Sequence, residues 1–159
     1  MEKKMANGVL LIKRLLGYES LNLPSYQSEL ASGMDIRANL SEEYRASGVV
    51  IPGWETAIIT TGISVEIPNN CEGQIRSRSG IATKNKVVVL NSPGTIDADF
   101  RGHLKVILIN LGSEGFLVEQ GNRIAQLIIA PILRPKILEV NELSSSNRGL
   151  KGFGSTGLT

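Results

Sequence analysis

The sequence predicts an all-β domain of the β-barrel or jelly-roll type, and three observations lead to this expectation. Several short stretches alternate apolar and polar residues, which is the period-two pattern of a half-buried strand. The 17 glycines, together with Pro and Asn, interrupt these stretches at the spacing of turns. Amphipathic helix patterns, which a parallel sheet needs between its strands, are weak. We therefore expect many antiparallel strands around one core, at most one short helix and a flexible C-terminal tail.

The expected elements follow one another closely along the chain. Gly62 to Ile67 alternates apolar and polar side chains and ends at Pro68-Asn69-Asn70, which is typical of a strand followed by a turn. Residues 79–86 open with Ser and Gly and predict one or two helical turns, whereas residues 41–47 are irregular. Apolar, largely β-branched runs predict further strands over residues 9–16, 34–38, 56–59, 73–77, 87–90, 104–110, 116–119, 123–130 and 132–140.

Length and composition favour one globular domain with an aliphatic core. The 159 residues are 42% hydrophobic but only 4% aromatic. Cys71 is the only cysteine, which excludes an intramolecular disulfide, and one histidine is too few for a Cys and His zinc site. A reducing cytoplasm is the expected compartment. The 17 Lys and Arg nearly balance the 15 Asp and Glu, and no apolar run reaches the roughly 20 residues of a membrane helix. We expect neither nucleic acid nor a membrane as a partner.

The composition changes near residue 144. Residues 1–143 carry the strand patterns and form the expected barrel domain, whereas residues 144–159 are rich in Ser, Gly, Asn and Lys. Residues 148–157 combine cations, a phenylalanine, two hydroxyls and four glycines. A tail that is only solvated has no evident need for Phe153 between glycines. We therefore expect a flexible lid that orders on a ligand.

Many glycines lie beside Ser, Thr, Arg, Asp or Asn in five segments: residues 32–35, 76–80, 91–102, 121–126 and 148–157. This composition suits a phosphate site built from several loops. Glycine lets backbone N–H groups approach an oxyanion, hydroxyls donate hydrogen bonds, and guanidinium groups give bidentate contacts. Arg78-Ser79-Gly80 is a candidate anion cradle at the start of a short helix, with a simple helix N-cap as the alternative.

The segment 91–102 predicts a β-hairpin that joins the strands expected at 87–90 and 104–110. The exposed backbone of a hairpin tip suits recognition of a planar base edge. Asp97 is a candidate general base or water-orienting group, with Asp99 on the same face of the strand. The alternative is that both carboxylates pair with Arg101 or with a neighbour.

Asp35 follows Gly33 at the start of an expected strand. It is a candidate for supporting a metal through water, because Mg²⁺ commonly keeps several of its waters. As an isolated aspartate it fits a turn residue better than a metal-supporting one. His103, Cys71 and Trp54 have no partner group in their sequence neighbourhood. We expect a structural or exposed role for His103, an unreactive Cys71 and a packing role for Trp54, at a subunit contact or within the fold.

The five segments, in this order, resemble the five motifs of the trimeric dUTP pyrophosphatases. The resemblance extends from about Leu23 to Gly157 and is most specific in Gly94-Thr95-Ile96-Asp97-Ala98-Asp99-Phe100-Arg101-Gly102 and Gly152-Phe153-Gly154-Ser155-Thr156-Gly157. It implies a jelly-roll-like subunit and a homotrimer with active sites at subunit interfaces. It also implies Mg²⁺-dependent hydrolysis of dUTP to dUMP and pyrophosphate, which limits uracil in DNA and supplies dUMP for dTMP synthesis.

The resemblance also implies roles for individual residues. Asp97 corresponds to the aspartate that positions the attacking water at the α-phosphorus, and Asp35 to the aspartate that supports Mg²⁺ through its waters, the ion itself lying mainly on the substrate phosphates. Gln126 lies near the α-phosphate. The uracil reader corresponds to Asn91 and the backbone of Gly94, Thr95 and Ile96. The phosphate-binding segment from a neighbouring subunit corresponds to Arg78, Ser79 and Gly80. The tail supplies Arg148 to the γ-phosphate, Phe153 over the uracil, and Gly154, Ser155 and Thr156 around the phosphates.

Four positions depart from the family pattern. Phe100 stands where tyrosine is usual, so the ring that packs on deoxyribose is kept while its hydroxyl is lost. Asn122 replaces an acidic residue, Ser77 replaces a proline, and Lys151 stands where glycine is frequent. Two other interpretations remain: an enzyme similar to dCTP deaminase, which shares the fold, and a non-catalytic trimer that senses nucleotides.

Overall fold

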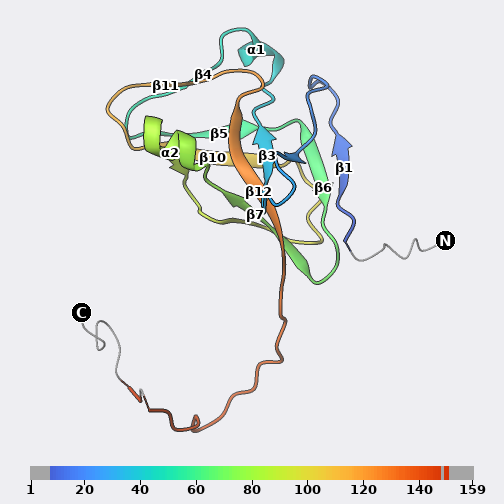
Figure 1. The fold of residues 1–159 in the computed structure, drawn as a ribbon, viewed down its shortest axis with the longest axis vertical. Coiled ribbons are helices and arrows are strands. Elements are labelled where there is room, and N and C mark those ends of the chain that lie inside the picture. The colour runs from blue at the N-terminus through green and yellow to red at the C-terminus, as the bar shows by residue number, and fades with distance from the viewer. Residues whose placement is uncertain (1–7, 148, 151–159) are drawn as a thin grey trace, which may run out of the picture.

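The computed structural model describes residues 8–147, 149 and 150, and the strand pairing in this part of the chain is antiparallel throughout (Figure 1). In chain order the elements are β1 (Leu11–Arg14), β2 (Ser25–Tyr26), β3 (Met34–Arg37), α1 (Glu42–Arg45), β4 (Val49–Ile51), β5 (Thr56–Thr60), β6 (Ile63–Glu66), β7 (Cys71–Arg76), α2 (Ser79–Asn85), β8 (Val87–Val89), β9 (Gly94–Ile96), β10 (Lys105–Asn110), β11 (Phe116–Val118) and β12 (Arg123–Pro131).

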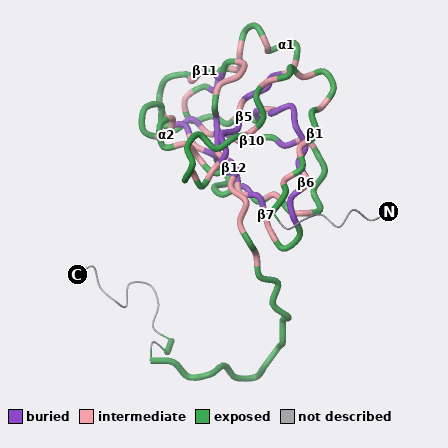
Figure 2. Tube along the Cα trace, turned by 45° about the vertical axis from the view of Figure 1, so that its right-hand side comes forward, coloured by how far each residue is buried: buried purple, intermediate pink, exposed green. Residues whose placement is uncertain are grey.

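The strands form four sheets around one aliphatic core. The largest sheet has the order β2-β3-β12-β7-β9, and the second has the order β5-β10-β8. The pairs β1-β6 and β11-β4 complete the body. The buried apolar side chains of the described residues are Ile, Leu, Val, Ala and Met, which explains the low aromatic content. Figure 2 shows the buried residues gathered along the central strands. The all-β, jelly-roll-like prediction is thereby confirmed.

Two details of the secondary structure differ from expectation. The described part has two short helices where at most one was expected, because the irregular stretch 41–47 contains α1. This helix is a single turn, with Glu42 and Glu43 at its start and Arg45 at its end, and this order of charges favours a helix. The helix is too short to produce a periodic pattern in the sequence. In the described residues, no helix is long and apolar enough to cross a membrane.

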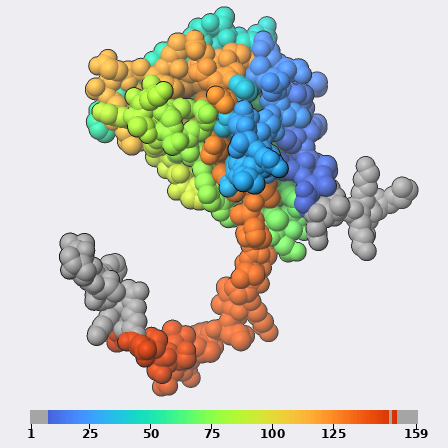
Figure 3. Space-filling view, in the orientation of Figure 1, coloured from blue at the N-terminus to red at the C-terminus, as the bar shows by residue number. Residues whose placement is uncertain are grey.

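The predicted strand at 132–140 is wrong. After β12, residues 132–147 form an exposed arm without helix or strand, which extends away from the body (Figure 3). Leu133 is 94% exposed and Ile137 91% exposed. The run is aliphatic, but none of its residues pairs with a strand of the described chain, and a strand needs such a partner for its backbone hydrogen bonds. The predicted division at residues 143 and 144 falls within this arm and stays a prediction.

Candidate active site

A buried carboxylate joins three of the glycine-marked segments. Asp35 on β3 is only 6% exposed, and its Oδ1 accepts a hydrogen bond from Arg78 Nε at 3.1 Å. Its Oδ2 accepts one from Arg123 Nη1 at 3.0 Å. Arg78 Nη1 donates in turn to the backbone carbonyl of Arg123 at 3.0 Å. Asp35 is therefore a strand residue in an ion-pair network, and its interpretation as a turn residue is wrong.

This network fixes the Arg78 guanidinium without using all its donors. A guanidinium carries five N–H groups. Arg78 directs Nε and Nη2 at Asp35, the latter over a long 3.5 Å, and Nη1 at the carbonyl of Arg123. N–H groups therefore remain for a ligand, and the side chain is 23% exposed. An arginine held in this way is pre-organised to receive a phosphate.

Ser79 and Gly80 open α2 directly after Arg78. The helix N-cap is Arg78, so the segment does begin the helix, but no side-chain capping bond forms there. Both residues are exposed, and a Cβ added at Gly80 would meet no atom within 4 Å. The space beside this backbone is open to a ligand. Ser77, which replaces the usual proline, accepts a hydrogen bond on Oγ from Val89 N at 2.8 Å and so ties the loop to β8.

Gln126 lies in the centre of the largest sheet, opposite Asp35 on β3 and Arg76 on β7. Gly33 makes room for it, because a Cβ at Gly33 would lie 3.2 Å from Gln126 Cβ and 3.4 Å from its Oε1. Three of the five segments, represented by Asp35, Arg78 and Gln126, thus meet on one part of the sheet. We call this set, with Ser79 and Gly80, the phosphate half-site.

The segment 91–102 is more elaborate than the predicted hairpin. Its flanking strands do pair, as β8 with β10, but Gly94–Ile96 form β9 and pair with β7 in the other sheet. Asn91 precedes this strand and folds back on it, since its Nδ2 would lie 3.1 Å from a Cβ at Gly94. Thr95 is exposed and Ile96 half-buried.

Asp97 and Phe100 lie just beyond β9, in a turn closed by a hydrogen bond from Phe100 N to Asp97 O at 3.1 Å. Both side chains are exposed. The expected strand face shared by Asp97 and Asp99 is wrong, because the strand ends at Ile96. Arg101 forms its ion pair with Glu66, not with either aspartate. We call Asn91, Gly94, Thr95, Ile96, Asp97 and Phe100 the base half-site.

The two half-sites lie far apart within one chain. Ile96 pairs with Gly73, whereas Gln126 pairs with Arg76 on the same strand β7. Three residues at about 3.3 Å and two strand spacings of about 4.8 Å separate the Cα atoms of Gln126 and Ile96 by roughly 14 Å. Asp97 is the next residue after Ile96 and lies further still from Gln126. A single small substrate atom cannot contact both Asp97 and Gln126 of one copy.

The remaining candidates are placed as follows. Arg148, Phe153, Gly154, Ser155, Thr156 and the departure Lys151 lie outside the described residues. Asn122 Oδ1 accepts a hydrogen bond from Glu119 N at 3.1 Å and closes the turn before β12. Within the described residues there is no group of three or more His, Cys, Asp or Glu side chains that could hold a metal ion.

His103 has the structural role expected of it. Its Nε2 accepts a hydrogen bond from Gly62 N at 3.0 Å, and its ring meets the edge of Tyr18 with 5.0 Å between centroids. Burial, with the nearby Lys105 charge, lowers the pKa of His103 below its usual value. Cys71 is half-buried at the start of β7. Trp54 is 70% exposed, so a packing role for it within the described chain is wrong.

Sequence reasoning missed the role of Arg123, although the residue lies in the fourth segment. Its signal was a cation beside a glycine turn at the start of a strand. That it pairs with Asp35 follows only from the pairing of β12 with β3. Sequence reasoning also missed the ion pair between Arg101 and Glu66.

Comparisons with known proteins identify the family of this chain. The dUTPase family model matches residues 19–157. The deoxyuridine 5'-triphosphate nucleotidohydrolase of Rhizobium johnstonii is 49% identical over 145 residues, which cover 91% of each chain. That of Caldanaerobacter subterraneus subsp. tengcongensis is 48% identical over 150 residues, which cover 94% of this chain and 98% of its own.

Solved structures show the same fold. A variant of the Staphylococcus bacteriophage 80alpha dUTPase, determined with dUpNHpp, matches with a TM-score of 0.80 and 30% identity over 95% of this chain and 99% of its own. A variant of the dUTPase from phage phi11 of S. aureus, described for its coordination of a structural Mg(II) ion, matches with a TM-score of 0.71 and 27% identity over 86% of this chain and 99% of its own. With a family model covering most of the sequence and relatives near half identity over nearly the whole chain, this protein belongs to the dUTPase family.

Proposed function

We propose that this chain hydrolyses dUTP to dUMP and pyrophosphate in a site shared between copies, with Asp97 of one copy orienting the attacking water. The activity (EC 3.6.1.23) rests on family membership, because the curated relatives quoted above are deoxyuridine 5'-triphosphate nucleotidohydrolases. The observation that carries the shared site is the separation of roughly 14 Å between Ile96 and Gln126 within one chain.

The phosphate half-site binds the triphosphate. Arg78, held by Asp35, offers its remaining N–H groups, while the open backbone at Ser79 and Gly80 and the amide of Gln126 add polar contacts. The base half-site of a second copy supplies the edge strand β9 and the exposed Asn91 to the uracil, and Phe100 to the deoxyribose. Asp97 then accepts a proton as water attacks the α-phosphorus and pyrophosphate leaves.

The sheet β5-β10-β8 offers a candidate surface for a second copy. The outer face of the sheet β5-β10-β8 is aliphatic, since Ile58 lies opposite Ile107 and Val88 opposite Ile109. Ile58 is 63% exposed in the single chain. An apolar outer face of this kind is typical of a surface buried by association, and the arm adds the exposed Leu133 and Ile137. We propose that copies associate as a homotrimer through this face.

The donor set fits a magnesium ion that the substrate itself carries. The described residues provide no cage of three carboxylates, and Asp35 is a single buried carboxylate beside the Arg78 donors. Asp35 would support such an ion through water. When bound, Mg²⁺ would neutralise negative charge on the phosphates and make the α-phosphorus more electrophilic. The predicted lid is proposed to close over the nucleotide with Arg148, Phe153, Gly154, Ser155 and Thr156. The cytoplasm stays the predicted compartment.

One assay tests the proposed reaction. The purified chain is incubated separately with dUTP, dCTP, dTTP and UTP in the presence of Mg²⁺, and pyrophosphate and the nucleotide products are measured. We expect pyrophosphate and dUMP from dUTP, with little turnover of the other three. Conversion of dCTP to dUTP would favour the deaminase interpretation, and binding of nucleotide without turnover would favour the sensing trimer.

A further inference from the structure

The turn that carries Asp97 and Phe100 is held by a side chain outside it. Arg101 Nη1 donates to the backbone carbonyls of Ala98 at 2.6 Å and Phe100 at 2.9 Å. Its Nη2 lies 3.3 Å from Oε1 of Glu66, the last residue of β6. The guanidinium therefore fastens the turn to a strand of a different sheet.

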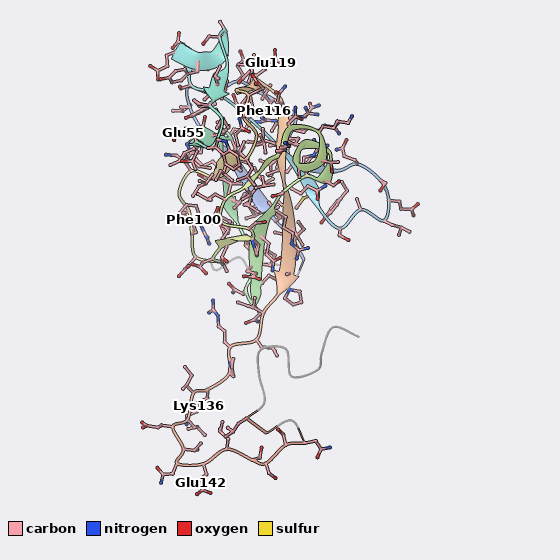
Figure 4. All side chains as sticks on the ribbon, turned by 90° about the vertical axis from the view of Figure 1, so that its left-hand side faces the viewer. Glu55, Phe100, Phe116, Glu119, Lys136 and Glu142 are labelled. Atoms are coloured by element: carbon pink, nitrogen blue, oxygen red, sulfur yellow. The ribbon has the colours of Figure 1, made fainter. Side chains whose placement is uncertain are left out.

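Gly102 sets the position of the Phe100 ring. A Cβ added at Gly102 would lie 2.6 Å from Cζ and 2.8 Å from Cε2 of that ring, closer than non-bonded carbon atoms approach each other. The ring therefore lies directly against the backbone of Gly102. Figure 4 shows Phe100 at the edge of the body, where a ligand or a second copy can reach it. A side chain at position 102 would push the ring out of this place.

We propose that Arg101, Glu66 and Gly102 are positioning residues that hold Asp97 and Phe100 in their working geometry. The inference rests on the proposed function, in which Asp97 orients the water and Phe100 packs on deoxyribose. Within the turn, the hydrogen bond from Phe100 N to Asp97 O is a weak constraint on two exposed side chains. Catalytic geometry is sensitive, since a displacement of about 1 Å costs up to about 100-fold in rate.

The first test is Arg101→Ala, with steady-state kinetics on dUTP and UTP. We expect kcat for dUTP to fall by about tenfold or more, because Asp97 is displaced, and the ratio of kcat/KM for dUTP over UTP to fall with it. Glu66→Gln keeps a hydrogen-bond acceptor for the guanidinium and should lie between wild type and Arg101→Ala. The matched control is Arg45→Ala on α1. Arg45 also pairs with a glutamate, at 3.6 Å, and donates to a backbone carbonyl.

The second test is Gly102→Ala, which changes the ring position without removing any hydrogen bond of the turn. It should lower the dUTP over UTP ratio by about fivefold or more, and affect that ratio more strongly than kcat for dUTP. Thermal melting and the oligomeric state of each variant show whether it is folded.

The proposal is overturned if folded Arg101→Ala and Gly102→Ala keep both kcat and the dUTP over UTP ratio within twofold of wild type, as Arg45→Ala is expected to do. Failure of the proposed function has a different signature. If wild type releases no pyrophosphate from dUTP, the proposed reaction is wrong, whereas if Asp97→Asn keeps full turnover, only the assignment of Asp97 is wrong. In the latter case the dUTP over UTP ratio, which depends on Phe100, still decides whether these residues position the turn.

Discussion

Replacing Asp35 by asparagine tests whether the buried carboxylate holds the phosphate half-site together. The substitution keeps the size of the side chain but leaves the Arg78 and Arg123 guanidiniums without their shared counter-charge. Removing one partner of a fully buried ion pair costs about 3–5 kcal/mol. The arginine side chains are 23% and 41% exposed and can regain water, so we expect a smaller loss of about 2 kcal/mol. At about 2–4 °C per kcal/mol, Tm should fall by about 4–8 °C.

Differential scanning calorimetry on Asp35→Asn measures this loss, and dUTP kinetics on the same protein show whether KM rises as Arg78 becomes free to move. The control is Glu19→Gln, which removes the charge from the partly exposed pair between Arg45 and Glu19, at 3.6 Å, and should cost less than Asp35→Asn, at most about 1 kcal/mol. An Asp35→Asn protein that melts within about 1 °C of wild type, against the expected fall of about 4–8 °C, and that has an unchanged KM would refute the reasoning.

Three further predictions concern other parts of the fold. Because the pKa of His103 is lowered in the folded chain, its contribution to the free energy of unfolding is complete above the unfolded pKa of 6.5 and is lost as pH falls through the folded pKa. Urea unfolding should therefore show that the stability advantage of wild type over His103→Gln shrinks from pH 7.5 to 5.5, and a constant advantage would contradict this. Gly48→Ala should destabilise by about 1–3 kcal/mol, because φ is 75° and the new Cβ would lie 2.8 Å from the carbonyl oxygen of Val118; an unchanged midpoint in urea would count against it. Ile107→Asp should prevent association through the β5-β10-β8 face, and a wild-type mass by sedimentation would show that this face is not the contact.

The strands that the sequence predicts well are those whose pattern is local. β6 alternates apolar and polar residues in its sequence, and β10 alternates buried and more exposed side chains, so their periodicity is visible without knowledge of the partners. β4 and β9 have three residues each, too few to show a period, and they become strands because a neighbour supplies hydrogen bonds. The arm shows the reverse case, since its aliphatic residues suit a strand but have no partner in the chain.

The candidate site follows the same division. The segments around Arg78, Asp97 and Gln126 could be singled out because glycines, hydroxyls and cations are adjacent in sequence. The network of Asp35 with Arg78 and Arg123 could not, because it joins residues 43 and 88 positions apart and depends on the pairing of β12 with β3. The distance between the half-sites likewise required the register of β7 with both of its neighbours.

Complementation between two inactive variants tests the shared site most directly. Asp97→Asn damages the base half-site, and Arg78→Ala damages the phosphate half-site. Each variant alone should be nearly inactive with dUTP. If the two half-sites of one active site come from different copies, unfolding and refolding the variants together should restore about one quarter of wild-type activity, the share of sites that combine two intact halves. If mixed and refolded protein is as inactive as the separate variants, while refolded wild type regains its rate, the site lies within one copy and the account is wrong.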